Sequence, residues 1–174
     1  MSLHLDDYHD AVKSHVAAEL TWLESVDDYP EQFGTLKTPC AFFGVVDWDR
    51  SEDQRMTGEL SVVLSCQLLI AFGQSGKVSS RAVRNAAMAA SLKIDEQRFG
   101  LGVTTAQFVS AEPWAFDPDL DQYVVWAVNF RHEIEVGEDQ FDLVPDFLPT
   151  DVNVAQAPKN GADHLDDYEQ LEDE

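Results

Sequence analysis

The chain has 174 residues, of which 44% are hydrophobic and 10% aromatic, so it can form one ordinary domain with an apolar core. Its 33 acidic and 11 basic residues give a formal net charge of −22 at pH 7, which argues against a protein that grips nucleic-acid phosphates. No stretch approaches the roughly 18 apolar residues of a membrane span, and the start MSLHLDDYHD lacks the basic region of a signal peptide. We therefore expect a soluble protein, made in a cytoplasm, with no membrane partner.

The first half of the chain predicts one helix and two strands. Residues 5–24 carry apolar side chains at helical spacing, and Asp6 and Asp7 stand where a helix N-terminus favours anions. A loop over residues 25–39 leads into a strand over 39–46, and the polar segment 47–58 predicts a long loop. Residues 59–72 place apolar side chains at every second position, which is the strongest strand signal in the chain.

The second half predicts one helix and two more strands. Residues 77–92 form a helix whose small side chains, together with Leu92, suit packing on a sheet. Strands follow over residues 101–111 and 123–136, with a turn between them. The order helix, strand, strand, helix, strand, strand predicts an α+β fold with both helices on one side of a largely antiparallel four-stranded sheet.

The two longest strands predict a projection from the domain. Fourteen residues in a strand extend about 45 Å, well beyond the usual length. We expect the strands over 59–72 and 123–136 to overhang the core as hairpin arms or to reach into a neighbouring subunit, where their edges would be covered.

The charge is weighted toward the C-terminus and predicts two regions. Residues 135–174 contain 13 acids and one base, and three prolines interrupt the segment after Gly137. We expect a folded domain over residues 1–137 and an extended acidic arm over 138–174, with a disordered end.

The sequence carries no catalytic or cofactor signature. It has no glycine-rich phosphate loop, no His-Glu-x-x-His pair, no Cys-x-x-Cys and no nucleophile elbow. The five histidines are expected to be satisfied or solvated, and Cys40 and Cys66 lie in apolar runs that favour buried, reduced thiols. We predict a protein that is not an enzyme and binds no cofactor.

Two acidic segments, residues 47–53 and residues 117–121, have side-chain oxygens at the spacing of calcium ligands. The first fails as an EF-hand because Glu52 stands where glycine is needed and Gly58 stands where the closing glutamate is needed. Solvated loops are the favoured interpretation, with a divalent ion shared between subunits as the alternative. The candidate loop residues are Asp47, Asp49, Asp53, Asp117, Asp119 and Asp121.

The second predicted helix carries a basic stripe. Lys77, Arg81 and Arg84 share one face, and Arg98 follows beyond the helix. The stripe is either a solvated helix face or a subunit interface that meets an acidic loop or the acidic arm of a neighbour. These four residues are the candidate interface residues.

Five segments together resemble a known family. They are the opening helix DYHDAVKSHVAAEL, the strand pair CAFFGVVDW and GELSVVLSCQLLIAF, the helix SSRAVRNAAMAASL and the closing strand DQYVVWAVNFRHEIEVG. In the order of the elements and in their local residue pattern, they resemble the tail terminator (tail completion) proteins of long-tailed bacteriophages, in particular the Mu-like branch. The acidic arm departs from the compact members of that family.

The resemblance implies a structural virion protein and its partners. Such proteins form a ring, typically a hexamer, on the head-proximal end of the tail tube, stop tail polymerisation and offer a docking surface to the head connector or neck protein. A ring of residues 1–137 would let DNA slide past without specific binding, because lumen carboxylates repel phosphates. The nearest alternative is a neck or head-closure ring. Others are an acidic DNA-mimic inhibitor, a calcium-dependent binding module and adaptation to a salty habitat.

Overall fold

The computed structural model describes residues 3–29, 36–73, 80–114 and 123–138, together with two short strands near the C-terminus. The chain divides into two units, Met1–Phe141 and Asp142–Glu174. In the second unit, β6 (Asn153–Val154) pairs with β7 (Glu169–Gln170) in antiparallel fashion. The predicted division after Gly137 stays a prediction, and all further description concerns the first unit.

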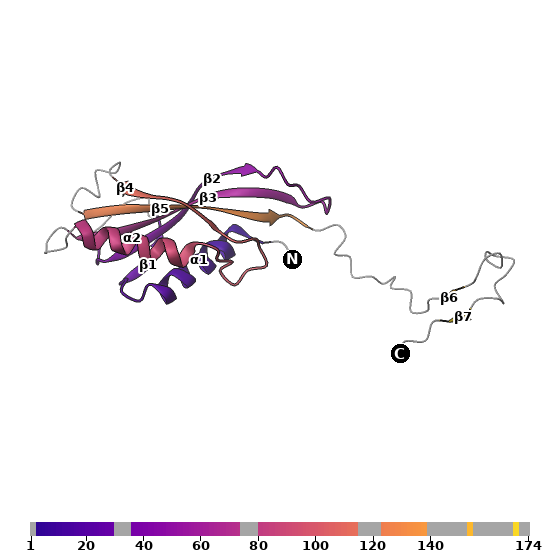
Figure 1. Ribbon diagram of the computed structural model, residues 1–174, viewed down its shortest axis with the longest axis horizontal. Helices are drawn as coiled ribbons and strands as arrows, with labels where there is room; N and C mark the ends of the chain where they lie inside the picture. The colour runs from indigo at the N-terminus through magenta and orange to yellow at the C-terminus, as the bar shows by residue number, and fades with distance from the viewer. Residues whose placement is uncertain are drawn as a thin grey trace. The chain divides into compact units, whose positions relative to one another are not determined.

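Two helices cover one face of the sheet in the first unit (Figure 1). They are α1 (Leu5–Glu19) and α2 (Ser80–Ile94). The first ends earlier than the predicted residue 24, because the backbone of Leu20 leaves the helical region (φ −109°, ψ 63°) and the Glu24 N–H then donates to the carbonyl of Pro39, next to β2. Neither helix is long and apolar enough to cross a membrane.

The sheet has five strands in the order β1-β2-β3-β5-β4. The strands are β1 (Ser25–Asp28), β2 (Cys40–Arg50), β3 (Leu60–Gly73), β4 (Gln107–Trp114) and β5 (Tyr123–Val136). Only β1 runs parallel to its neighbour, and the other pairs are antiparallel. The predicted α+β class, with both helices on one side of a largely antiparallel sheet, is therefore confirmed.

The predicted count of four strands is wrong, because β1 lies where the sequence predicts a loop. It is held from Ser25 to Asp28 by parallel pairing with Cys40 to Phe43 of β2. Its last residue, Asp28, also accepts a 2.6 Å hydrogen bond from the Lys13 Nζ of α1. Both contacts are distant in sequence, so local propensity does not show them.

Strand β2 continues beyond the predicted end at Val46, so Asp47 and Asp49 lie on a strand and not in a loop. The pairing register shifts between Val45 and Asp47, which marks a β-bulge, and then continues to Arg50 opposite Val62 of β3. The strand therefore extends because the long β3 offers it further partners. For the same reason β4 continues to Trp114 along β5, past the predicted end at residue 111.

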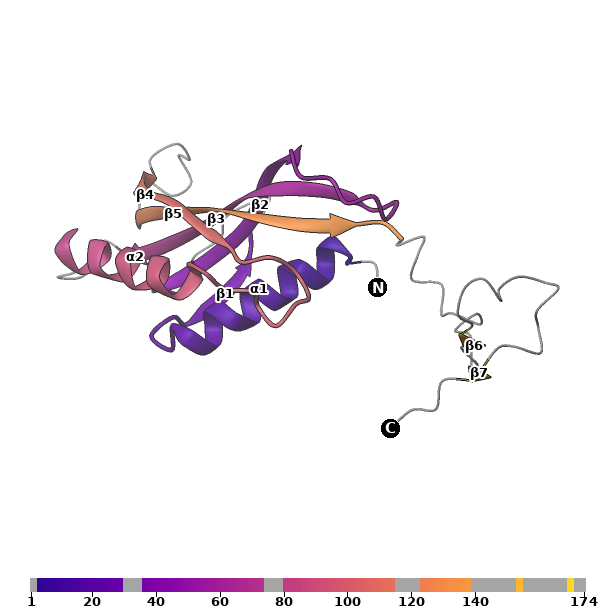
Figure 2. The ribbon, with the colours of Figure 1, turned by 45° about the vertical axis from the view of Figure 1, so that its right-hand side comes forward.

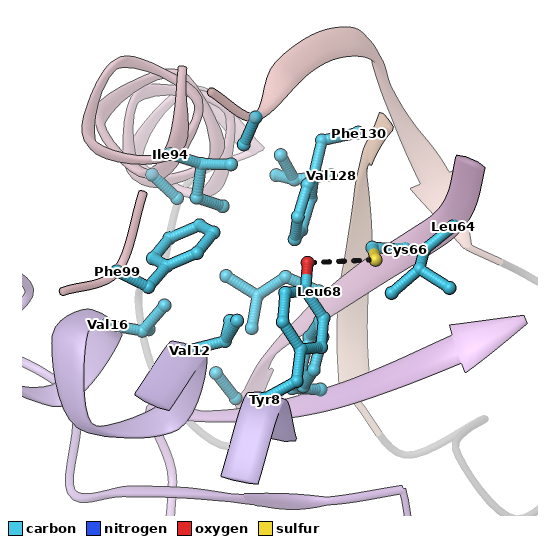
Figure 3. Packing of buried hydrophobic residues seen from close by; sticks show 14 of the residues in the cluster. Tyr8, Val12, Val16, Leu64, Cys66, Leu68, Ile94, Phe99, Val128 and Phe130 are labelled. Carbon is cyan, nitrogen blue, oxygen red and sulfur yellow. Dashed lines mark hydrogen bonds between the residues drawn. The ribbon is translucent and has the colours of Figure 1, made fainter. Parts of the chain in front are cut away.

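The main core lies between the helices and the sheet. Tyr8, Val12 and Val16 of α1 meet the alternating side chains of β3, among them Cys66 and Leu68, as Figure 3 shows. A smaller buried cluster occupies the opposite face of the sheet at the end where β1 lies. The sheet is thus apolar on both faces at that end.

At the other end, β2, β3 and β5 extend beyond the part of the sheet that α2 covers (Figures 1 and 2). The two longest strands, β3 and β5, have 14 residues each and stay paired from Leu60 opposite Val136 to Gly73 opposite Tyr123. Val62, Leu64 and Ile134, near this end of the two strands, are buried in the main core, so the prediction that these strands overhang the core is wrong for these residues.

Candidate assembly surfaces

The outer segment of β2, residues 46–50, is exposed and has a strand partner on one edge only. Pairing with β1 ends at Phe43, so within the described part of the chain the outer segment pairs with β3 alone. Val46 is 64% exposed and Trp48 is 60% exposed. An open strand edge with large exposed apolar side chains is available to another chain.

The predicted acidic residues Asp47 and Asp49 lie on this outer segment and are exposed. By register they stand opposite Ser65 and Val63 of β3, on the face that carries no helix. Trp48 stands between them on the other face, opposite Leu64. The outer segment therefore offers two carboxylates on one side and an indole on the other.

The remaining predicted acidic residues are not on this strand. Asp53 lies in the loop that connects β2 to β3. Asp117, Asp119 and Asp121 lie outside the described residues. Within the described ranges, no three His, Cys, Asp or Glu side chains gather as metal ligands would.

The β2–β3 loop is tied down by side chains from β5. The Ser51 hydroxyl donates to Glu133 Oε1, and Arg55 makes a double contact with Glu135, at 2.5 Å through Nε and 3.0 Å through Nη1. The Gln54 side-chain amide donates to two backbone carbonyls at 2.8 Å each. These bonds brace the projecting hairpin against the neighbouring strand.

Helix α2 carries the described part of the basic stripe. Arg81 and Arg84 are exposed, whereas Lys77 lies outside the described residues. The Arg84 guanidinium lies 6.0 Å from the ring centre of Trp126, so this arginine packs against its own sheet. Arg81 is exposed as well, and no ion pair or cation–π contact joins it to another described residue. Helix α2 contains no acidic residue.

The same helix exposes two large apolar side chains. Met88 is 62% exposed and Leu92 is 71% exposed. The prediction that Leu92 faces the sheet is wrong, because Ala87, Ala90 and Ile94 fill that face. Arg81, Met88 and Leu92 form what we call the exposed face of α2.

An open groove of about 1280 Å³ lies beside the outer half of β5. Pairing between β4 and β5 reaches only as far as Arg131, and the segment around Thr104 lies next to the strand beyond that point. The predicted interface residue Arg98 lines this groove together with Asp53 and Arg55. The structure thus separates Arg98 from the arginines of α2.

The buried histidine is part of a hydrogen-bonded chain in the core. The Tyr8 hydroxyl lies 2.9 Å from His132 Nδ1 and 3.4 Å from Cys66 Sγ, the latter contact being drawn in Figure 3. His132 Nε2 lies 3.0 Å from the carbonyl of Thr104. A neutral imidazole satisfies both contacts, because Nε2–H donates to Thr104 and Nδ1 accepts from Tyr8. The prediction of a satisfied histidine is confirmed for His132.

The ionisation of these groups fits a structural role. Burial lowers the pKa of His132 and raises the pKa of Tyr8. Burial also raises the pKa of Cys66 to about 12 and that of Cys40 to about 11, so both thiols stay protonated and poorly nucleophilic. The predicted buried, free cysteines are confirmed.

Sequence reasoning missed the apolar part of both surfaces. Trp48 stands in a segment that is otherwise polar, and this isolated aromatic was the one signal that the segment does more than form a solvated loop. Met88 and Leu92 lie four residues apart on α2, a spacing that places them on one face. Which face that is depends on how the helix packs.

No protein-family model matches the sequence, and no curated protein matches it. The structure is similar to a solved chain from the virion of a native gene transfer agent particle. That match has a TM-score of 0.50 at 17% sequence identity, and it covers 69% of this chain and 84% of that chain. At this level of identity the likeness shows that the two chains share a fold.

Proposed function

We propose that the chain is a structural protein of a phage-type virion. The observation that carries the proposal is the fold shared with a chain of a gene transfer agent virion, which spans most of that chain. The family resemblance of the five sequence segments supports the same class independently of the fold comparison. In this role the protein performs no reaction and needs no cofactor.

Within the virion, we assign the chain to a ring, expected to be a hexamer, at the head-proximal end of the tail tube. There it ends tail polymerisation and presents a surface to the head connector or neck protein. Two features support a ring: the open edge of the β2 outer segment and the exposed face of α2, which are different surfaces of one molecule. Different surfaces joined head to tail around an axis close a ring.

The acidity of the chain suits the passage of DNA through such a ring. Asp47 and Asp49 are exposed on the face without helices, and no described residue forms an ion pair with either. Carboxylates that face a lumen repel phosphates, so DNA slides without specific binding. The lumen is where this proposal places Asp47 and Asp49.

The genetic test deletes the reading frame of this chain from the genome that encodes the particle. The proposal predicts tail tubes of uncontrolled length that do not join heads. A neck or head-closure ring, the nearest alternative, would instead leave tails of normal length beside heads that lose DNA. Normal particles would exclude both roles.

A further inference from the structure

We propose that the outer edge of β5, residues 133–136, binds an extended basic segment of a partner protein as an added strand. The site is the groove of about 1280 Å³ that lies along this edge. In the partner segment, basic and apolar side chains alternate. The inference adds a partner site to the proposed virion role and does not depend on the ring.

The backbone of β5 has no strand partner along the groove within the described part of the chain. Pairing with β4 ends at Arg131, whereas pairing with β3 on the other edge continues to Val136. The carbonyl of Glu133 points toward the groove, because it accepts a 2.7 Å hydrogen bond from the hydroxyl of Thr104, which lines it. Successive residues of a strand turn their backbone groups to opposite edges, so the N–H of Glu133 and the N–H and C=O of Glu135 point the same way. Such an edge accepts an added strand.

The groove is formed before a partner binds. One wall is the segment between α2 and β4, which runs beside the outer half of β5 (Figures 1 and 2). Phe99 is buried and anchors this segment, with its ring centre 5.5 Å from that of His132. On the other side, the contact of Arg55 with Glu135 holds the β2–β3 loop. A groove that is already ordered loses less entropy when it binds a peptide.

The groove has an apolar side and an acidic side. Ile134, Leu101 and Val103 all line it and belong to the main core or pack against it. Glu133 and Glu135 alternate with Ile134 along β5, so their side chains lie on the face without helices. Side chains of paired residues share a face. An added strand therefore fits when its apolar side chains lie on the helix side and its cations on the other.

Carboxylates outnumber cations along the groove. Six acidic and two basic side chains line it, which gives a formal charge of −4. The acidic residues are Asp7, Glu52, Asp53, Glu59, Glu133 and Glu135, and the basic residues are Arg55 and Arg98. Arg55 is already bound to Glu135. A potential of this sign favours a basic partner and orients it.

The 174 residues of this chain contain no such segment, so the partner is a different protein. A strand that presents cations on one face needs them two positions apart. The 11 basic residues are spread so that no two stand closer than three positions. One pair at that spacing, Arg81 and Arg84, lies on α2. In the proposed virion the partner is a neighbouring structural protein.

The first experiment measures the binding of synthetic peptides to the full-length chain by calorimetry at low ionic strength. The probe is acetyl-Val-Lys-Val-Lys-Val-Lys-Val-amide, whose lysines share one face of a strand. Two further peptides are methylated on three backbone nitrogens, one on its lysines and the other on its valines. Only one of these two sets faces β5, so their dissociation constants should differ about tenfold although their charges are equal.

The second experiment reverses charges in the groove. Glu52→Lys combined with Asp53→Lys should raise the dissociation constant of the probe about fivefold, because both carboxylates are exposed in the groove. Glu24→Lys combined with Asp27→Lys is the matched control, since both residues are exposed outside the groove and the net charge changes equally. It should leave the constant nearly unchanged. Thermal melts check that both variants are folded.

Hydrogen exchange locates the bound strand. The amides of Glu133 and Glu135 should exchange faster than that of Ile134, which points to β3, and the probe should slow both. Failure of the probe to bind, or equal binding of the two methylated peptides, would overturn the proposal. So would protection of both amides in the free chain, since another part of the chain would then cover the edge. None of these readouts involves tail length, so this site and the virion role fail separately.

Discussion

The hydroxyl of Tyr8 on α1 lies 2.9 Å from Nδ1 of His132 on β5, at the centre of the core. His132 in turn reaches the carbonyl of Thr104, so one imidazole ties the first helix, the fifth strand and the segment before β4 together. Tyr8 and His132 are both buried, so water cannot replace the bond between them. This contact fixes α1 over the part of the sheet from which the hairpin projects.

Tyr8→Phe should lower the free energy of unfolding by about 1–3 kcal/mol, because it leaves Nδ1 of a buried imidazole without a donor. Urea denaturation of the full chain measures the change. The double variant Tyr8→Phe with His132→Leu should cost less than the sum of the single changes, since it removes both polar partners. Strict additivity would show that the two side chains do not interact.

Stability should fall as the pH is lowered through the range in which histidine titrates. Burial lowers the pKa of His132, so the native imidazole stays neutral while the unfolded chain takes up a proton below its ordinary value of 6.5. The stability that the neutral His132 imidazole contributes is complete above pH 6.5 and is lost as the pH falls from there toward the pKa of the folded state. The chain should therefore be less stable at pH 5.5 than at pH 7.5, and linkage limits the share of this one group to at most about 1.4 kcal/mol.

The measurement for His132 is a difference between two proteins. Urea midpoints of the unaltered chain and of His132→Gln at both pH values remove the effects of the many carboxylates, which are common to both. The unaltered chain should lose more stability on acidification than the variant. Equal losses would mean that the imidazole is protonated in the folded protein.

Asp28→Asn should have a small effect that depends on pH and salt. The hydrogen bond from Lys13, with a second from His9, lowers the pKa of Asp28. The carboxylate therefore contributes stability above its ordinary value near 3.8, and that contribution is lost as pH falls toward the folded pKa. Because the side chain is 55% exposed, the change at neutral pH should be about 0.5 kcal/mol and should shrink in high salt. Asp27→Asn is the matched control.

Substitutions of the two arginines of α2 should have different effects on the free energy of unfolding of the isolated subunit. Arg84→Ala should lower the free energy of unfolding by about 0.5–1 kcal/mol, because the guanidinium lies over Trp126. Arg81→Ala should change it by less than about 0.5 kcal/mol, as surface substitutions do. Denaturation at concentrations below assembly distinguishes them, and the reverse order would place the internal contact on Arg81.

The strongest periodic signals were enough to predict the class of fold. Strand β3 and helix α1 each bury one side, so their apolar residues recur at a fixed spacing that can be recognised within a short stretch of sequence. Only one of the four residues of β1, Val26, is apolar, and this strand forms because it pairs with β2. Residues 47–50 look like a loop for the same reason, since β3 supplies the partner strand.

The candidate surfaces were predictable only in their charges. Asp47, Asp49 and Arg81 are exposed, as expected of charged side chains. Alternation along β5 places His132 on the same face as Phe130 and Ile134, but its hydrogen-bond partner could not be read from the sequence, because Tyr8 is 124 residues away. The exposure of Leu92 likewise depends on how α2 rotates against the sheet, which Ile94 decides by occupying the core.

The most direct test of the central claim is to image tail tubes with the purified full-length chain bound. Tubes polymerised from the tail-tube protein of the same particle are mixed with this chain, and their ends are averaged by electron microscopy. The account predicts a closed ring at one end of each tube and no further growth from that end. Tubes that keep growing from bare ends while the chain stays free in solution would contradict it.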